Sequence, residues 1–316
     1  MKICTIGDLC ADLILPYGEA KADVRNQRTG RKHELTFRPG GQVGNTSVVL
    51  ARIGEHPYFV TDLCSDPIGQ NLKQQLSEAG VDFSWSRVNP DKANMICLAV
   101  VEDNDQIIFP WLPPGSGYPE FSRENLSLVP RENMMVFSGG MIMTDSFSSI
   151  EAVLSLLEEL KAAGSVIVFD LNARAETYGM NRERKQAFAR AVELSDYLLG
   201  SGAAEFASVC GIHDLHEAAC FLSNGKRTVI ARDGHRPVLV VENGRTAAVP
   251  TVPVKVTGTI GAGDTFNAAF LHALNQGADA VKSVRFANRI AGYMISHPGH
   301  LSLPENAGEI LRQCME

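Results

Sequence analysis

The residues best suited to chemistry lie in one stretch, residues 258–274, which reads GTIGAGDTFNAAFLHAL. Gly261, Ala262 and Gly263 lead directly into Asp264, after which apolar residues recur at helical spacing. Backbone N–H groups at a helix start lack intrahelical partners and lie at the positive end of the helix dipole, so this turn is suited to phosphate. A carboxylate is repelled by phosphate, which favours Asp264 as a base. An aspartate that only caps the helix, worth about 1 kcal/mol, is the alternative interpretation.

A second glycine-rich entry to a helix occurs in residues 39–54, PGGQVGNTSVVLARIG. Gly40 and Gly41 permit backbone conformations barred to other residues, and Asn45 follows with a free amide. Asp12 lies beyond the first expected strand, where ligands bind in open α/β sheets. A tight turn and a turn cap explain these residues equally well.

Two further polar groups follow expected strands. Asp170, Asn172 and Arg174 alternate after the apolar run VIVF, so in an extended segment their side chains would point the same way. Such a set suits sugar hydroxyls or a carboxylate, and an ion pair between Asp170 and Arg174 is the alternative. Glu205 stands at the start of another expected helix, where a glutamate commonly complements only the helix dipole.

An alternation of strands and helices must position these groups. It predicts a mainly parallel sheet covered on both faces. The expected strands are 2–6, 13–15, 58–63, 134–137, 166–169, 197–199, 228–231 and 238–241, and the expected helices are 69–79, 148–163, 183–194, 280–295 and those after the two glycine turns.

Two insertions interrupt this alternation. Residues 16–38 are polar and irregular up to the alternating run 33–37, and further strand-like runs occur at 95–101 and 106–111. We expect them to form one small sheet outside the main one, a lid over the site.

Composition excludes several classes of protein. With 45% hydrophobic and 21% charged residues the chain is ordinary for a soluble globular protein, and a net charge of -7 argues against a nucleic-acid-binding surface. There is no apolar run long enough to span a membrane. Seven scattered cysteines form no C-x-x-C pair, and Asp8 and Asp12 interrupt the apolar N-terminus, so we expect a reduced, cytoplasmic protein without a signal peptide.

The two glycine motifs, GGQVGN at residues 40–45 and GAGD at 261–264, occur in an order and separation that resembles the PfkB/ribokinase family of carbohydrate kinases. The resemblance covers nearly the whole chain. It implies a ribokinase-like three-layer α/β/α sandwich with a central, mostly parallel sheet and a small β lid. The chain would then be a single domain, 1–316, with the lid formed from about 12–38 and 92–118.

The resemblance implies an ATP-dependent sugar kinase that uses Mg²⁺. Asp264 resembles the catalytic base that takes a proton from the acceptor hydroxyl, and the N–H groups around Gly261, Ala262 and Gly263 resemble the anion hole for the γ-phosphoryl group. Glu205 resembles the glutamate that organises magnesium and its waters. The remaining implied contacts are to the acceptor, from Asp12, Gly40, Gly41, Asn45, Asn172 and Arg174, and to the nucleotide, from Arg232, Gly234 and Asn288.

Two departures from the family pattern concern the cations. Gly258 stands where many members have an aspartate that supports a monovalent cation, which puts potassium activation in doubt. Gly202 stands where many have an asparagine three residues before the glutamate, and Ser201 is an unproven substitute.

The acceptor class follows from DLNAR at residues 170–174, which is similar to the D-x-N-x-R of fructokinase-like and 2-keto-3-deoxygluconate-kinase-like members. It favours a free sugar or sugar acid. A nucleoside stacked on Phe109 or Trp111, and a non-catalytic sugar sensor, are alternatives. A dinucleotide-dependent oxidoreductase has less support, because G-x-G-x-x-G is missing after the first strand. A homodimer through the lid is also left open.

Overall fold

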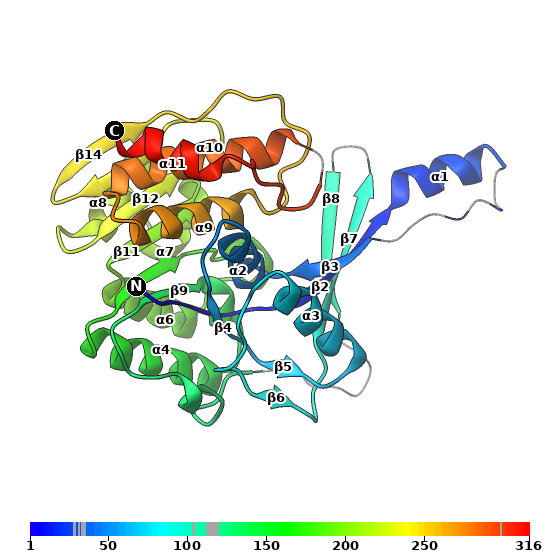
Figure 1. The fold of residues 1–316 in the computed structure, drawn as a ribbon, viewed down its shortest axis with the longest axis horizontal. Helices are drawn as coiled ribbons and strands as arrows, with labels where there is room; N and C mark the ends of the chain where they lie inside the picture. The colour runs from blue at the N-terminus through cyan, green and yellow to red at the C-terminus, as the bar shows by residue number, and fades with distance from the viewer. Residues whose placement is uncertain (28–29, 31, 33–35, 103–104, 112–119, 298) are drawn as a thin grey trace.

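A sheet of eight strands forms the centre of the computed structural model (Figure 1). Its order is β14-β13-β12-β11-β10-β9-β1-β4. Within this order the neighbouring strands from β12 to β4 pair in parallel, whereas β13 pairs antiparallel with both β12 and β14. The bounds are β1 Ile3–Ile6, β4 Tyr58–Val60, β9 Met135–Gly139, β10 Val166–Asp170, β11 Tyr197–Ser201, β12 Thr228–Arg232, β13 Val238–Glu242 and β14 Arg245–Val249. The structure describes residues 1–27, 30, 32, 36–102, 105–111, 120–297 and 299–316.

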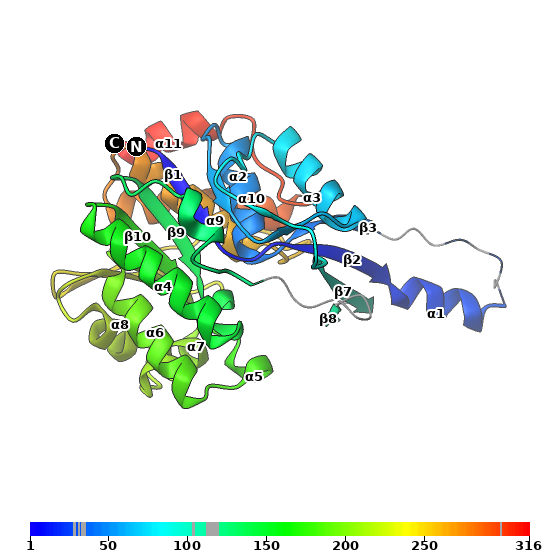
Figure 2. The ribbon, with the colours of Figure 1, turned by 90° about the horizontal axis from the view of Figure 1, so that it is seen from below.

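Helices cover both faces of this sheet, and Figure 2 shows the two helix layers on opposite sides of β9 and β10. Side chains alternate along a strand, so Phe137 and Val168 pack in one core while Val136 and Ile167 pack in the other. The predicted three-layer α/β/α fold is confirmed. The helices of the body are α2 Gln42–Arg52, α3 Pro67–Glu78, α4 Phe147–Ala162, α5 Ala175–Tyr178, α6 Arg182–Leu194, α7 Ala203–Cys210, α8 Leu215–Ser223, α9 Ala262–Asn275, α10 Ala280–Ser296 and α11 Ala307–Met315, with 3-10 turns η1 Asn125–Leu128 and η2 Gly140–Thr144.

A second, four-stranded sheet lies beside the first and is built from both insertions. Its order is β3-β2-β7-β8, with β2 parallel to β7 and the other pairs antiparallel. Only three residues separate β1 from β2, so the chain passes directly from one sheet to the other. The strands are β2 Cys10–Pro16, β3 Thr36–Gly40, β7 Met95–Glu102 and β8 Asp105–Trp111, and a separate pair is formed by β5 Leu63–Cys64 and β6 Val88–Asn89.

One insertion contains a helix where the sequence predicts irregular structure. α1, Tyr17–Arg25, follows β2 and projects away from the body in both views (Figures 1 and 2). Lys21 Nζ lies 5.7 Å from the ring centroid of Tyr17, one helical turn earlier. Such i, i+4 contacts stabilise a helix whose overall polarity hides it from a search for an apolar face.

Two further findings bear on the sequence analysis. No helix among the described residues has the length and apolar character needed to cross a membrane. The side chains of Phe109 and Trp111, considered above for base stacking, and residues 33–35 of the alternating run lie outside the described part of the structure.

Candidate functional site

The turn that begins α9 leaves backbone donors unpaired. Gly261 has φ +82°, and a Cβ there would lie 2.6 Å from Cδ2 of Leu301, so this position needs glycine. The N–H of Ala262 donates to a carbonyl of the preceding turn at 3.1 Å. Among the described residues, the N–H groups of Gly261, Gly263 and Asp264 have no protein acceptor, so Ala262 is the one predicted donor that is already engaged. The three unengaged donors lie at the positive end of α9, where they can receive an anion.

The Asp264 carboxylate lies where α9 meets α2. Its Oδ2 accepts a hydrogen bond from Nδ2 of Asn45 at 2.8 Å, so the two glycine turns of the sequence converge. Burial raises the pKa of Asp264 to about 7, and the Asn45 bond opposes this shift. The charges of Asp8 and Asp170 raise the pKa further. A carboxyl group that titrates near neutral pH is suited to accept a proton from a hydroxyl.

A second aspartate, Asp8, caps the start of α2. Its carboxylate accepts from the N–H groups of Gln42 at 2.8 Å and Val43 at 3.2 Å. Gly41 has φ +88°, and a Cβ there would lie 2.8 Å from the carbonyl oxygen of Asp8. Burial raises the pKa of Asp8, and the two N–H bonds lower it. Asp8 follows β1, which is the signal that singled out Asp12, but a substrate contact was predicted for Asp12 alone.

Asp12 lies on β2 and faces the turn before α2. A Cβ on Gly40 would lie 2.2 Å from Oδ1 of Asp12, so glycine is needed for this close approach. Arg38 Nε is 3.9 Å from Oδ2 of Asp12, and both side chains are less than one-fifth exposed. Burial raises the pKa of Asp12, while Arg38 lowers it. The structure thus brings Asp12, Gly40, Gly41 and Asn45 to the same end of α2.

The segment after β10 differs from the prediction. Asn172 and Arg174 have φ +30° and +46°, so the backbone is not extended and the three side chains do not share one direction. Arg174 Nε donates to Oδ1 of Asn172 at 2.8 Å. Asp170 points inward, where its Oδ2 accepts from Arg232 at 2.8 Å and from Asn267 at 2.6 Å. The alternative ion pair between Asp170 and Arg174 is therefore also wrong, because Arg232 is the partner.

Arg232 connects this buried carboxylate to the turn before α9. Its guanidinium donates to the carbonyl oxygens of Gly263 and Gly200, both at 3.2 Å, and lies 5.1 Å from the ring centroid of Phe266. The side chain is 12% exposed. Arg232 therefore braces the turn that carries Asp264, and its direct contact with a nucleotide stays a prediction.

The other two residues predicted to contact nucleotide have different surroundings. Gly234 lies in the turn between β12 and β13 with φ +57°, and no atom of the described part of the chain lies within 4 Å of where a Cβ would be. Asn288 of α10 is buried, and its amide donates to the carbonyl of Pro250 at 2.9 Å. Their roles also remain predictions.

Glu205 holds two backbone segments together. Its carboxylate oxygens accept from the N–H of Ala173 at 2.9 Å and of Ser201 at 2.6 Å. Burial, followed by the charge of Asp170, raises the pKa of Glu205 to about 7. Each oxygen takes one N–H and keeps a lone pair, so the carboxylate fits an indirect contact to Mg²⁺ through water.

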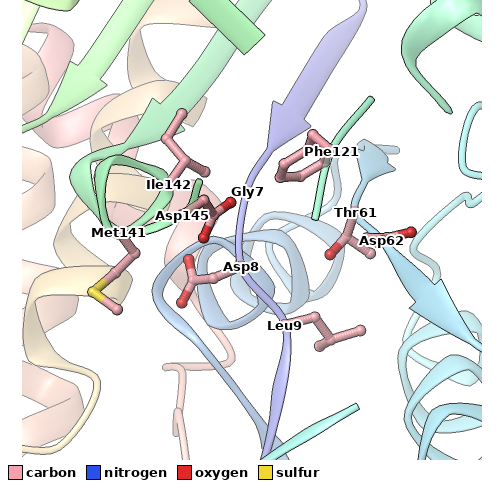
Figure 3. Close-up of a pocket in the computed structure, with 9 residues that line it drawn as sticks. All are labelled: Gly7, Asp8, Leu9, Thr61, Asp62, Phe121, Met141, Ile142 and Asp145. Carbon is pink, nitrogen blue, oxygen red and sulfur yellow. The ribbon is translucent and has the colours of Figure 1, made fainter. Parts of the chain in front are cut away.

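A small cavity at the end of β1 contains a residue that the sequence analysis missed. It has a volume of about 20 Å³, room for one water molecule, and Figure 3 shows Asp8 and Asp145 pointing toward each other in it. Burial raises the pKa of Asp145 to about 7, and Ser149 donates to its Oδ2 at 2.9 Å. No sequence signal marked Asp145, because it follows a 3-10 turn and not a strand.

Comparison with known proteins decides the family. The sequence profile described as pfkB family carbohydrate kinase matches residues 1–306. The chain belongs to this family. It is accordingly a kinase, a phosphotransferase that acts on an alcohol group.

Individual members of the pfkB family are similar to the chain over nearly all of its length. A 5-dehydro-2-deoxygluconokinase of Clostridium tetani is 24% identical over 308 residues, covering 92% of this chain and 90% of that protein. The fructokinase of Vibrio cholerae O395, solved with fructose, ADP and calcium, has a TM-score of 0.82 at 21% identity, covering 100% of this chain and 99% of the other. A putative ribokinase II of E. coli, solved with ATP and Mg²⁺, has a TM-score of 0.80 at 20% identity, covering 99% of both chains.

Proposed function

We propose that this kinase transfers the γ-phosphoryl group of ATP to a hydroxyl group of a free sugar or a sugar acid. The observation that carries the proposal is the contact between Asp264 and Asn45, which joins the two glycine turns at a carboxylate with a pKa of about 7. Asp264 accepts the proton of the acceptor hydroxyl as the new oxygen–phosphorus bond forms and the bond from the γ-phosphorus to the bridging oxygen breaks, which releases ADP. The unpaired N–H groups of Gly263 and Asp264 face the transferring phosphoryl oxygens and stabilise their charge.

Mg²⁺ neutralises phosphate charge when it is bound, and Glu205 is the residue that would hold it through water. In the chain itself, the Glu205 carboxylate fixes the 170–174 segment by accepting a hydrogen bond from the N–H of Ala173. Glu205 therefore links the cation region to the segment that carries Asn172 and Arg174.

Gly258 offers no carboxylate to a monovalent cation, so we expect equal kinase rates in potassium and tetramethylammonium salts.

Arg174 supports an acceptor that carries a carboxylate. Among the described residues its terminal guanidinium nitrogens have no hydrogen-bond partner, while Nε is held by Asn172. Its positive charge lowers the pKa of Asp8, so it lies within electrostatic range of the start of α2. A guanidinium fork held at one end and open at the other suits a carboxylate.

A coupled ADP-release assay with ATP and Mg²⁺ over hexoses, pentoses, sugar acids and nucleosides tests this function. We expect turnover with a free sugar or sugar acid, and a loss of about 10²- to 10⁴-fold in kcat for Asp264→Asn with every acceptor. Asp214→Asn is the matched control, because Asp214 also starts a helix but lies at α8, and asparagine caps as well as aspartate.

Three outcomes would contradict the proposal. Near-normal turnover by Asp264→Asn would show that Asp264 is not the catalytic base. Turnover with nucleosides alone would replace the acceptor class. Sugar binding by calorimetry without ADP release for any acceptor would favour the sensor.

A further inference from the structure

Two thiols and a carboxylate come together in the second sheet. Cys10 and Asp12 alternate on β2, so they share one face, and the register of the parallel pair places Cys97 of β7 opposite Asp12. One ligand atom from each of the three lies within 4.8 Å of the others. Among the described residues this is the one group of three such side chains that lie this close.

The donor set matches a thiophilic divalent cation. Zn²⁺ binds thiolate sulfur at about 2.3 Å and carboxylate oxygen at about 2.0–2.2 Å, almost always with tetrahedral geometry. Ligand atoms in such a site lie roughly 3.5 Å apart, so three atoms within 4.8 Å need to close by about 1 Å. Cys10 Sγ already lies 3.5 Å from Oδ1 of Asp12.

The charges around the cluster balance with and without an ion. Without one, the Asp12 carboxylate is offset by Arg38, whose Nε is buried with no hydrogen-bond partner among the described residues. With one, two thiolates and a carboxylate are offset by a divalent ion and Arg38. Counted over the three side chains, Arg38 and the ion, the net charge is the same in both states, which favours binding in a poorly solvated place.

We propose that Cys10, Asp12 and Cys97 form a binding site for a thiophilic divalent cation of the zinc class. On binding, each thiol releases one proton to the buffer and the ion exchanges water ligands for two Sγ atoms and one carboxylate oxygen. The fourth position is left for water. The ion inhibits the kinase, because it occupies the Asp12 carboxylate beside Gly40; this consequence rests on the proposed function, and the binding itself does not.

Binding is tested on the full, reduced chain without substrate. Zn²⁺ binding is measured by equilibrium dialysis, and Co²⁺ replaces Zn²⁺ to give a thiolate-to-metal charge-transfer band. We expect one ion per chain and the band in the unaltered protein. Because loss of an outer-shell partner alone weakens metal binding about 10- to 100-fold, Cys97→Ser should weaken it by at least that much.

Matched cysteine variants separate this site from others. Cys220 is exposed, and its Sγ lies 3.6 Å from Nε2 of His216, so Cys220→Ser removes a second thiol that has a possible ligand beside it. It should leave both the affinity and the band unchanged. Asp12→Asn provides a second, thiol-preserving variant and should weaken Zn²⁺ binding while keeping most of the Co²⁺ band. Any of three results overturns the proposal: Cys220→Ser loses Zn²⁺ binding, Cys97→Ser binds Zn²⁺ as well as the unaltered chain, or the unaltered chain does not bind Zn²⁺.

Inhibition is tested separately with the acceptor found in the ADP-release screen. Zn²⁺ should raise the apparent KM for the acceptor, and Cys97→Ser should resist it. A chain that binds the ion but phosphorylates nothing keeps this inference and loses the proposed function. A chain that phosphorylates a sugar but gives neither binding nor a charge-transfer band keeps the function and loses this inference.

Discussion

At the scale of single residues, the pKa of Asp264 connects burial to activity. Its usual carboxyl value is raised to about 7 because the charged form is desolvated. A protonated carboxyl cannot accept the hydroxyl proton, so kcat/KM should fall as the pH drops through about 7.

Asn45 sets the pH at which kcat/KM falls, that is, the acid limb of the pH profile. Its Nδ2 donates to the charged form of Asp264 at 2.8 Å and so lowers the pKa. Asn45→Ala should therefore move the acid limb of kcat/KM to higher pH by about 1 unit, since a hydrogen bond to a charged group is worth about 1.5 kcal/mol or more. Asn306→Ala is the control, because Asn306 is exposed and its side chain caps no helix. A limb that stays in place or moves to lower pH would contradict this role.

At the scale of elements, one buried network joins β10, β12 and α9. Asp170 accepts from Arg232 and Asn267, and Arg232 also donates to Oδ1 of Asn267 at 3.0 Å. Arg232→Met keeps the apolar stem but leaves the Asp170 charge without its cation, which should cost about 3–5 kcal/mol of unfolding free energy. Urea denaturation measures this loss of unfolding free energy. Arg236→Met breaks an exposed ion pair with Asp233 and should cost about 0–1 kcal/mol; equal losses would mean that the network does not stabilise the fold.

Gly41, in the turn before α2, is a position where an added side chain should be costly for two reasons. Gly41→Ala combines a positive φ with a contact of 2.8 Å to the backbone of Asp8, whereas at Gly277, with φ +89°, no atom of the described residues lies within 4 Å of an added Cβ. We expect a loss of about 1 kcal/mol for Gly277→Ala and at least 2 kcal/mol more for Gly41→Ala, together with a raised KM for the acceptor. Thermal unfolding and steady-state kinetics test this, and equal losses in both variants would rule out the close approach.

The elements also show where sequence patterns suffice. Parallel strands that are buried on both faces read as apolar runs, which is why β9 to β12 were predicted near their true bounds. The β13–β14 hairpin was missed although Asn243 and Gly244, with φ +50° and +73°, form the turn sequence that most strongly indicates a hairpin. The predicted common direction of the side chains in DLNAR, residues 170–174, was wrong because alternation fixes side-chain direction only while the backbone stays extended.

At the scale of the whole molecule, contacts between distant segments are what the sequence could not supply. Asn45 and Asp264 are 219 residues apart, and Asp170 and Asn267 are 97 apart. Each helix start was recognisable by itself, but the packing of α2 against α9 decides that they meet. The resemblance to a family supplied that juxtaposition as an expectation, whereas the partner of Asp170 came only from the structure.

The second sheet offers a surface on which to test the homodimer that the sequence left open. Its two edge strands each contain a proline, Pro39 in β3 and Pro110 in β8, which has no N–H to donate, so pairing between edges is disfavoured. Phe37 of β3 is 38% exposed, and a contact between sheet faces would bury it. We therefore expect sedimentation velocity to show a dimer at micromolar concentration that Phe37→Asp converts to a monomer. Phe221→Asp is the matched control, because Phe221 is 60% exposed on α8, far from this sheet, and this variant should stay dimeric (Figure 2). A monomeric unaltered chain, or dissociation in both variants, would exclude a dimer through this sheet.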